Sequence, residues 1–231
     1  MTYEKSIGDH SLSVLLGQEA YSLEYKLLSA SKQGFPFPGV TEIGSAAVMS
    51  SMNSYTDKYR LLSWLSRVEY DYKDRYYISG SFRTDGSSRF HPDNRWGQFW
   101  SLGGSWRISN EEFMKPYSSW LDNLKLRASY GSLGNNTLGD NRDKDGNYMS
   151  QSMFAQTNYV LGRTVVNGLS QTAIANADLT WETTYITNIG VDYGLLGNRL
   201  SGSIEYFDKR TKGILIDLPA PMVHGNATVP K

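Results

Sequence analysis

The sequence predicts an all-β fold in which about eight antiparallel strands run up and down, an architecture typical of a transmembrane β-barrel. Three observations lead to this prediction. Apolar and polar residues alternate with a period of two, several of the alternating segments reach ten residues or more, and short connections alternate with long ones. A tilted strand of about ten residues is long enough to cross a bilayer.

Alternation identifies each strand in turn. Between Arg75 and Arg83, for example, Ile78 and Phe82 fall on one face, while Ser79 and Ser81 fall on the other. The same pattern recurs along the chain, and the expected strands are 2–7, 10–18, 59–72, 75–85, 96–108, 123–133, 181–195 and 200–212.

The connections sort by length. Short turns are expected at Gly8-Asp9, Lys73-Asp74 and 196–199, and a link of middling length at 109–122. Long loops are expected over 19–58, over about ten residues from Gly86, and over 134–180. In an up-and-down order every long loop falls at one end, as in outer-membrane barrels with short periplasmic turns and long extracellular loops.

The two faces of the strands cannot be assigned from the pattern alone. A soluble sandwich hides its apolar stripe inside, whereas an outer-membrane barrel turns that stripe to lipid and keeps a polar interior. Aromatic residues crowd the strand ends, which fits girdles at lipid–water interfaces but also a soluble aromatic core: Tyr70, Tyr72, Tyr76, Tyr77, Trp96, Trp100, Trp120, Trp181 and Tyr206. At this point both orientations stay open.

Composition excludes several classes of protein. The chain has 231 residues, no cysteine, and 23 Lys+Arg against 23 Asp+Glu, so thiol chemistry and general nucleic-acid binding are not expected. No apolar stretch approaches the length of a membrane-spanning helix, and residues 1–12 do not resemble a signal peptide. Serine-nucleophile, phosphate-loop and zinc-protease motifs are absent, so we expect no enzyme and no cofactor.

Four polar features could carry chemistry, and each has a simpler structural interpretation. The segment 141–146 (NRDKDG) resembles the start of a calcium loop, but Ser152 stands where the bidentate acid belongs, which favours a solvated loop. We interpret 85–90 (DGSSRF) as a tight turn. The remaining features are expected to be scattered surface residues or a solvated carboxylate pair: His10, His91, His224, Glu111 and Glu112.

Basic side chains on the polar strand faces could line a water-filled interior. We expect them instead to pair with neighbouring acids: Arg67, Arg83, Lys125 and Arg127. Aromatic residues in the expected loops could stack on sugar rings, although loop aromatics often pack the loop against itself. The candidate substrate-mouth residues are Phe35, Phe37, Tyr55, Tyr148, Phe154 and Tyr159.

Eight segments, in order and over most of the chain, resemble the barrel of SusC/RagA-type TonB-dependent outer-membrane transporters. They are DYKDRYYISGSFRTDGSSRF at 71–90, NRWG at 94–97, GSWRIS at 104–109, WLDNLKLRASYG at 120–131, LGN at 133–135, NADLTWE at 176–182, NIGVD at 188–192 and NRLSGSIEYFDKRTK at 198–212. Each segment alone is a weak match, but their order and spacing are specific.

The resemblance implies a 22-stranded, plugged barrel in the outer membrane that imports oligosaccharides or peptides, with TonB and a SusD-type surface lipoprotein as partners. Because this chain has about eight expected strands and shows no plug domain, we expect a partial barrel, open and curved, that does not transport alone. The alternative is a self-contained small β-barrel or a soluble carbohydrate-binding module. An apolar stripe on the convex side favours the first interpretation, and a dry apolar interior favours the second.

Overall fold

The computed structural model describes residues 1–137, 147–219 and 228–230. Strands dominate the described part of the chain, with three short 3₁₀ helices between them. The elements are β1 Thr2–Ile7, β2 His10–Gln33, η1 Ile43–Ser45, β3 Val48–Tyr72, β4 Tyr76–Ser87, β5 Trp96–Arg107, η2 Ile108–Asn110, η3 Glu112–Tyr117, β6 Leu121–Asn135, β7 Met153–Leu161, β8 Thr164–Ala173, β9 Glu182–Leu195, β10 Leu200–Lys212, β11 Asp217–Pro219 and β12 Thr228–Pro230. No helix in the described ranges is long and apolar enough to span a membrane.

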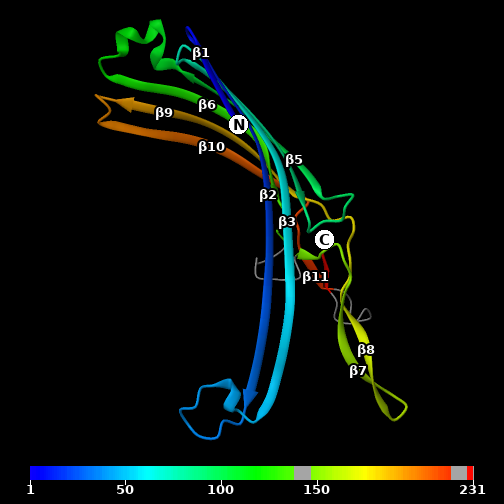
Figure 1. Ribbon diagram of the computed structural model, residues 1–231. Helices are drawn as coiled ribbons and strands as arrows, with labels where there is room; N and C mark the ends of the chain where they lie inside the picture. The colour runs from blue at the N-terminus through cyan, green and yellow to red at the C-terminus, as the bar shows by residue number, and fades with distance from the viewer. Residues whose placement is uncertain (138–146, 220–227, 231) are drawn as a thin grey trace.

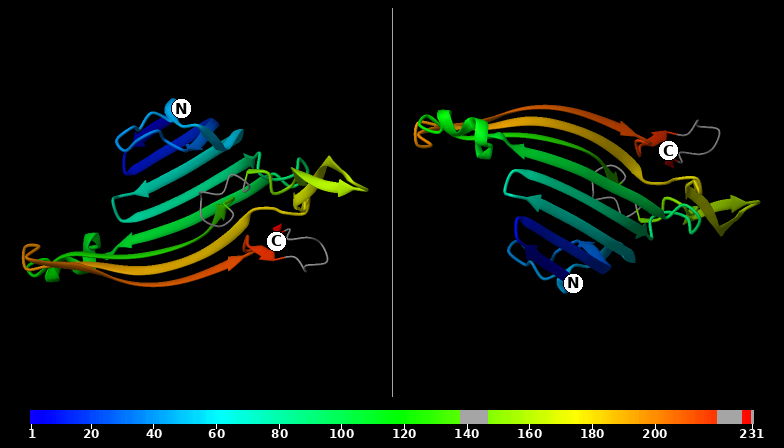
Figure 2. Two further views of the ribbon diagram at one scale, coloured as in Figure 1. Left: turned by 90° about the horizontal axis from the view of Figure 1, so that it is seen from below. Right: turned by 90° about the horizontal axis from the view of Figure 1, so that it is seen from above.

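Eight of the strands form one antiparallel sheet in the order β1-β2-β3-β4-β5-β6-β9-β10. The sheet is strongly curved, and its edge strands β1 and β10 lie at opposite ends of the curve (Figures 1 and 2). Because β1 and β10 do not pair, the barrel is not closed within the described chain. The structure therefore confirms the expected partial, open barrel, and it does not have the closed form of the alternative.

Short connections gather at one end of the sheet and long ones at the other, as expected (Figure 1). The β1–β2 turn contains Gly8 at a φ of 57°, and the β3–β4 turn holds Lys73 and Asp74 at φ of 56° and 51°. Residues with positive φ reverse the chain within a few positions, which keeps neighbouring strands in register. The helices η2 and η3 occupy the longer link between β5 and β6 at this same end.

The expected loop over 19–58 is mostly strand. β2 continues to Gln33 and β3 begins at Val48, and the two pair from His10↔Tyr72 to Gln33↔Val48. The connecting loop is therefore only 34–47. The resulting β2–β3 hairpin extends well beyond the other strands of the sheet (Figure 1). The prediction was wrong here because the apolar residues change face beyond Ala20, which hid the continuing alternation.

Two further expectations need correction. The expected loop over 134–180 contains the hairpin β7–β8, which joins β11 and β12 in a separate four-stranded sheet. The expected tight turn at 85–90 begins instead inside β4, because Asp85 pairs with Gly97 and Gly86 with Trp96 of β5. The chain reverses only after Ser87.

Candidate functional site

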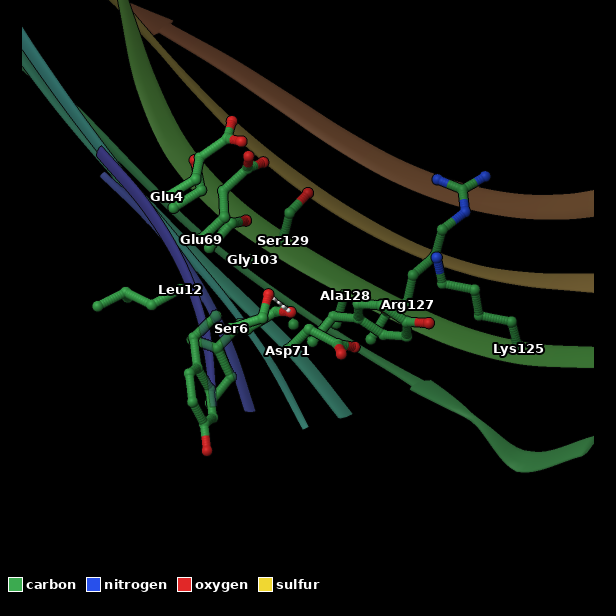
Figure 3. Close-up of a pocket in the computed structure, with 18 of the residues that line it drawn as sticks. Glu4, Ser6, Leu12, Glu69, Asp71, Gly103, Lys125, Arg127, Ala128 and Ser129 are labelled. Carbon is green, nitrogen blue, oxygen red and sulfur yellow. Dashed lines mark hydrogen bonds between the residues drawn. The ribbon is translucent and has the colours of Figure 1, made fainter. Parts of the chain in front are cut away.

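The two faces of the curved sheet differ in chemistry. On the face that carries the apolar stripe, Ile78, Leu102 and Ile204 are 57%, 58% and 70% exposed, although they lie in the middle of strands. Polar residues on the opposite face of the sheet line a hollow. Figure 3 shows Glu4, Glu69, Ser129 and Arg127 projecting to one side of the sheet, with Leu12 on the other.

The exposed apolar face has the height of a membrane. Along β3 its outward residues are Tyr72, Tyr70, Val68, Ser66, Trp64 and Leu62, followed by Arg60 and Lys58. Tyr72 and Leu62 are ten residues apart, about 33 Å at roughly 3.3 Å per residue. At a tilt of about 40° this length spans roughly 25 Å of thickness, the height of the apolar band of an outer-membrane barrel.

Aromatic side chains mark the edge of this band that lies nearest the short connections. His10, Tyr72, Tyr76 and Trp106 follow one another across β2 to β5 in register. The centroids of successive rings, taken in that order, are 4.8, 6.4 and 6.3 Å apart, and the last two pairs are stacked. At the outer edge, the ring of Trp96 covers Gly86, where a Cβ atom would lie 2.9 Å from it. The ladder is typical of the aromatic girdles at membrane interfaces, and Trp96 is one aromatic residue at the opposite edge.

Glu111, expected to be solvated, is instead nearly buried, and it joins the β5–β6 link to the aromatic ladder. Its carboxylate accepts hydrogen bonds from the Tyr76 hydroxyl at 2.6 Å and the Trp106 indole at 2.9 Å, and it pairs with Arg75 at 3.2 Å. These donors, the Tyr76 hydroxyl first, hold the pKa of Glu111 below its usual range. Glu112, by contrast, is exposed and pairs with Lys115.

The polar hollow on the inner face has a volume of about 560 Å³ and is lined from β1, β2, β3, β4, β5, β6 and β9. Arg127 pairs with Asp192 and Glu205, as expected, whereas Lys125 lies over the Tyr77 ring, 4.9 Å from its centre, and no acid pairs with it among the described residues. Outside the hollow, Arg67 pairs with Glu69 at 2.5 Å and Arg83 with Asp85 at 2.6 Å. The inner wall is therefore polar and close to charge-balanced.

One small hydrophobic core lies at the long-loop end of the sheet. It consists of Phe90, Phe99, Met149, Leu179, Trp181 and Leu215, with Leu61 packed against it. The indole of Trp181 donates to the carbonyl oxygen of Arg95 at 2.8 Å. Gly97 leaves room for this ring, since a Cβ atom there would lie 2.8 Å from Trp181. The core anchors the loops to the barrel wall and does not seal off the apolar stripe of the strands.

The six candidate mouth aromatics lie in four separate places. Tyr55 lies on the inner face of the β2–β3 hairpin, Phe35 and Phe37 lie in the loop at its tip, and Phe154 and Tyr159 lie on the β7–β8 hairpin. The hydroxyl of Tyr148 accepts the Lys58 backbone N–H at 3.0 Å, which ties the 147–152 segment to the hairpin base. The structure therefore does not bring all six together.

A tyrosine cluster, which sequence reasoning missed, surrounds Tyr55. Tyr25 faces Tyr55 with ring centroids 6.1 Å apart, and Tyr21 faces Tyr59 at 5.9 Å. Leu23 lies between them, and Tyr21, Leu23 and Tyr25 are nearly half exposed. The signal was present in the sequence, because Tyr21, Leu23, Tyr25 and Leu27 alternate strictly with polar residues, in the opposite phase to Leu12, Val14 and Leu16.

The remaining sequence features gather into no second site. His10 joins the aromatic ladder, and His91 contacts Asp93 in the β4–β5 loop. Within the described residues no group of acids and histidines could hold a metal ion. His224 and the calcium-like segment 141–146 lie outside the described residues.

An open, strongly curved antiparallel sheet with an apolar outer band, an aromatic ladder at one edge of that band and a polar inner wall defines part of a transmembrane β-barrel of the outer-membrane class. The family model described as "TonB dependent receptor-like, beta-barrel" matches residues 4–229. The chain belongs to this family.

Individual relatives agree. The chain is 32% identical over 227 residues to TonB-dependent receptor P3 of Formosa agariphila, covering 97% of this chain and 22% of that relative. It is 31% identical to TonB-dependent receptor SusC of Bacteroides thetaiotaomicron, covering 95% of this chain and 21% of SusC. It also matches a solved structure of the RagAB peptide transporter with a TM-score of 0.86 and 32% identity, over 25% of that chain. The chain thus spans about a fifth of the length of these curated relatives.

Proposed function

We propose that these strands form part of the wall of an outer-membrane importer that takes up oligosaccharides or peptides, and that the tyrosine cluster of the β2–β3 hairpin contacts the substrate at the outer mouth. The observation that carries the proposal is the change of face beyond Ala20. Leu12, Val14 and Leu16 lie on the lipid-facing side of β2, whereas Tyr21, Leu23, Tyr25 and Leu27 lie on its inner side.

The position of the hairpin supports a substrate role. Its inner face begins where the membrane band ends, and Tyr21, Leu23 and Tyr25 stay exposed there although they are large and apolar. Exposed apolar patches in water indicate binding sites. Tyrosine rings stack on the apolar faces of sugars and of peptide side chains, while their hydroxyls bond polar groups.

Transport in this proposal needs partners that the relatives suggest. Energy would come through TonB, as the family name implies, and a SusD-type lipoprotein would close over the mouth. Part of a barrel wall has two open edges with unpaired backbone groups, which are not tolerated in lipid. We therefore propose that the strands act within a longer barrel.

Substrate binding tests the role of the tyrosine cluster. The protein is extracted from the outer membrane in the longest form in which cells make it, and binding to panels of oligosaccharides and of short peptides is measured by calorimetry. Replacing Tyr21 and Tyr25 together by Ala should weaken binding about five- to thirtyfold, since each aromatic contact contributes about 0.5–1 kcal/mol.

Tyr206→Ala is the matched control, because Tyr206 is an exposed tyrosine on the lipid side of β10. It should leave the affinity unchanged. Unchanged binding by the Tyr21/Tyr25 variant would contradict the proposed mouth, and absence of binding by both panels would contradict the proposed substrate classes.

A further inference from the structure

A groove of about 400 Å³ crosses the lipid-facing side of β2, β3 and β4. In register across these strands stand Leu16, Ser66 and Phe82, so a small side chain separates two large apolar ones. Trp64 borders the groove on the next row toward the long-loop end. The groove therefore exists because Ser66 is small, whereas its neighbours in the row, Leu16 and Phe82, are large.

The groove is dry in character. The Ser66 hydroxyl donates to the backbone carbonyl of Phe82 at 3.4 Å, so this hydroxyl is satisfied within the protein. The walls formed by Leu16, Trp64 and Phe82 are exposed and apolar. A hydrocarbon chain fits such a surface, whereas water would find few polar groups to bind.

Along the membrane normal, the groove lies about one leaflet from each edge of the apolar band. Ser66 is six residues from Arg60 and six from Tyr72 along β3, about 20 Å in each direction at roughly 3.3 Å per residue. With a tilt of about 40° each interval covers about 15 Å of depth, half of a hydrocarbon core about 30 Å thick. The groove lies near the midplane, one leaflet below Arg60.

Arg60 carries a charge that the protein does not neutralise among the described residues. It is exposed on the outward face just beyond the apolar band. The other Lys and Arg residues of β3 and β4 pair with acids within 4.0 Å: Lys58 with Glu24, Arg67 with Glu69, and Arg83 with Asp85 and Glu19. For Arg60 no acidic partner is found among the described side chains.

We propose that this surface binds one anionic lipid of the outer leaflet, with its phosphate on Arg60 and an acyl chain in the groove beside Ser66. The charge at the outer boundary and the apolar groove one leaflet below it match the two ends of such a lipid. Guanidinium groups bind phosphate by strong, charge-assisted hydrogen bonds. This lipid site is independent of the proposed substrate mouth, which lies on the opposite face of the sheet.

Native mass spectrometry tests the site. The protein, again in the longest form that cells make, is exchanged into micelles that contain either lipid A or phosphatidylcholine, and retained lipid is counted. We expect one lipid A per protein and little phosphatidylcholine. R60Q should weaken retention of lipid A about tenfold by removing the charged contact. S66W should lower it by a similar factor by filling the groove, and S66L provides a second filling variant.

Two controls separate the site from general lipid affinity. Lys26→Gln removes an outward cation that pairs with Glu24, and Ile204→Trp adds an indole to the lipid face of β10, far from the groove. Both should retain lipid A normally, and heat-modifiable migration on gels confirms that each variant is folded. Equal retention of phosphatidylcholine, or normal retention of lipid A by R60Q, would overturn the head-group contact. Normal retention by both S66W and S66L would overturn the acyl-chain site.

Discussion

The carboxylate of Glu111 accepts a hydrogen bond of 2.6 Å from the hydroxyl of Tyr76, and this contact links a connection outside the membrane to the ladder of rings at its edge. Tyr76 stacks on Trp106 with ring planes 10° apart, and Trp106 also donates to Glu111 at 2.9 Å. One ionised carboxylate thus orients two side chains that face the interface. This arrangement predicts that the contribution of Glu111 to the stability of the fold depends on pH.

Replacing Glu111 by Gln should destabilise the fold at neutral pH. The pKa of Glu111 is lowered in the folded protein, chiefly by the Tyr76 hydroxyl, so its stabilising contribution is fully present above its ordinary pKa of 4.5 and disappears as the pH falls through the folded pKa. The stability difference between wild type and E111Q should therefore shrink below about pH 4.5. Urea unfolding in detergent micelles at several pH values measures it.

The neighbouring exposed carboxylate serves as the control for this prediction. Glu112→Gln breaks the contacts of Glu112 with Lys115 and Arg75, but it removes no contact of the Tyr76–Trp106 stack. Its near-ultraviolet circular dichroism should match wild type, whereas E111Q should lose aromatic signal. Identical spectra for E111Q and wild type would contradict the role of Glu111 in ordering the ladder.

A second prediction concerns the tight β1–β2 turn. Gly8 has a φ of 57°, and no heavy atom lies within 4 Å of the position that a Cβ atom would take, so Gly8→Ala adds backbone strain without a steric clash. The expected cost in the free energy of unfolding is about 1 kcal/mol. Gly44 is equally unobstructed but has no positive φ, so Gly44→Ala should be neutral. Equal unfolding midpoints for the two variants would argue against strain at Gly8.

A third prediction concerns the core at the long-loop end. Trp181 is 9% exposed, contacts Phe90 and Phe99 edge-on or tilted, and donates to the Arg95 carbonyl. Trp181→Ala should cost about 3–5 kcal/mol, as for other buried aromatic residues. The exposed Trp96 provides the comparison, since Trp96→Ala should cost much less. Limited proteolysis of the loops measures the effect, and similar cleavage rates for the two variants would contradict the anchoring role of Trp181.

Most of the sheet could be predicted from the sequence because alternation survives wherever one face meets lipid and the other meets a polar interior. In β4, for example, Ile78 and Phe82 point outward and Ser79 and Ser81 inward, as the pattern indicated. The strand ends were harder to predict. Beyond Ala20 the outward face meets water and becomes charged, so the alternation of β2 continues with its phase reversed.

The parts of the site that the sequence did not predict depend on contacts between segments that are distant in the chain. Nothing local indicates that Glu111 is held by Tyr76, or that Tyr148 bonds the backbone of Lys58, 90 residues away. The β7–β8 hairpin was not predicted from the sequence for another reason. Val160 and Leu161 are consecutive apolar residues and both exposed, so that hairpin lacks the period of two that a one-sided environment imposes.

The last prediction tests which face meets lipid. Leu102 is 58% exposed on the apolar face of β5, and an arginine there would have to enter the hydrocarbon region. Leu102→Arg should destabilise the folded protein in vesicles by about 2–4 kcal/mol, the cost of a basic residue near the membrane midplane. Ser129→Arg places the same side chain in the polar hollow, where water and nearby acids accommodate it, and should cost less than about 1 kcal/mol. Urea unfolding in vesicles compares the two. If Ser129→Arg were the costlier change, the polar face would be the buried one and the strands would not be oriented for a membrane.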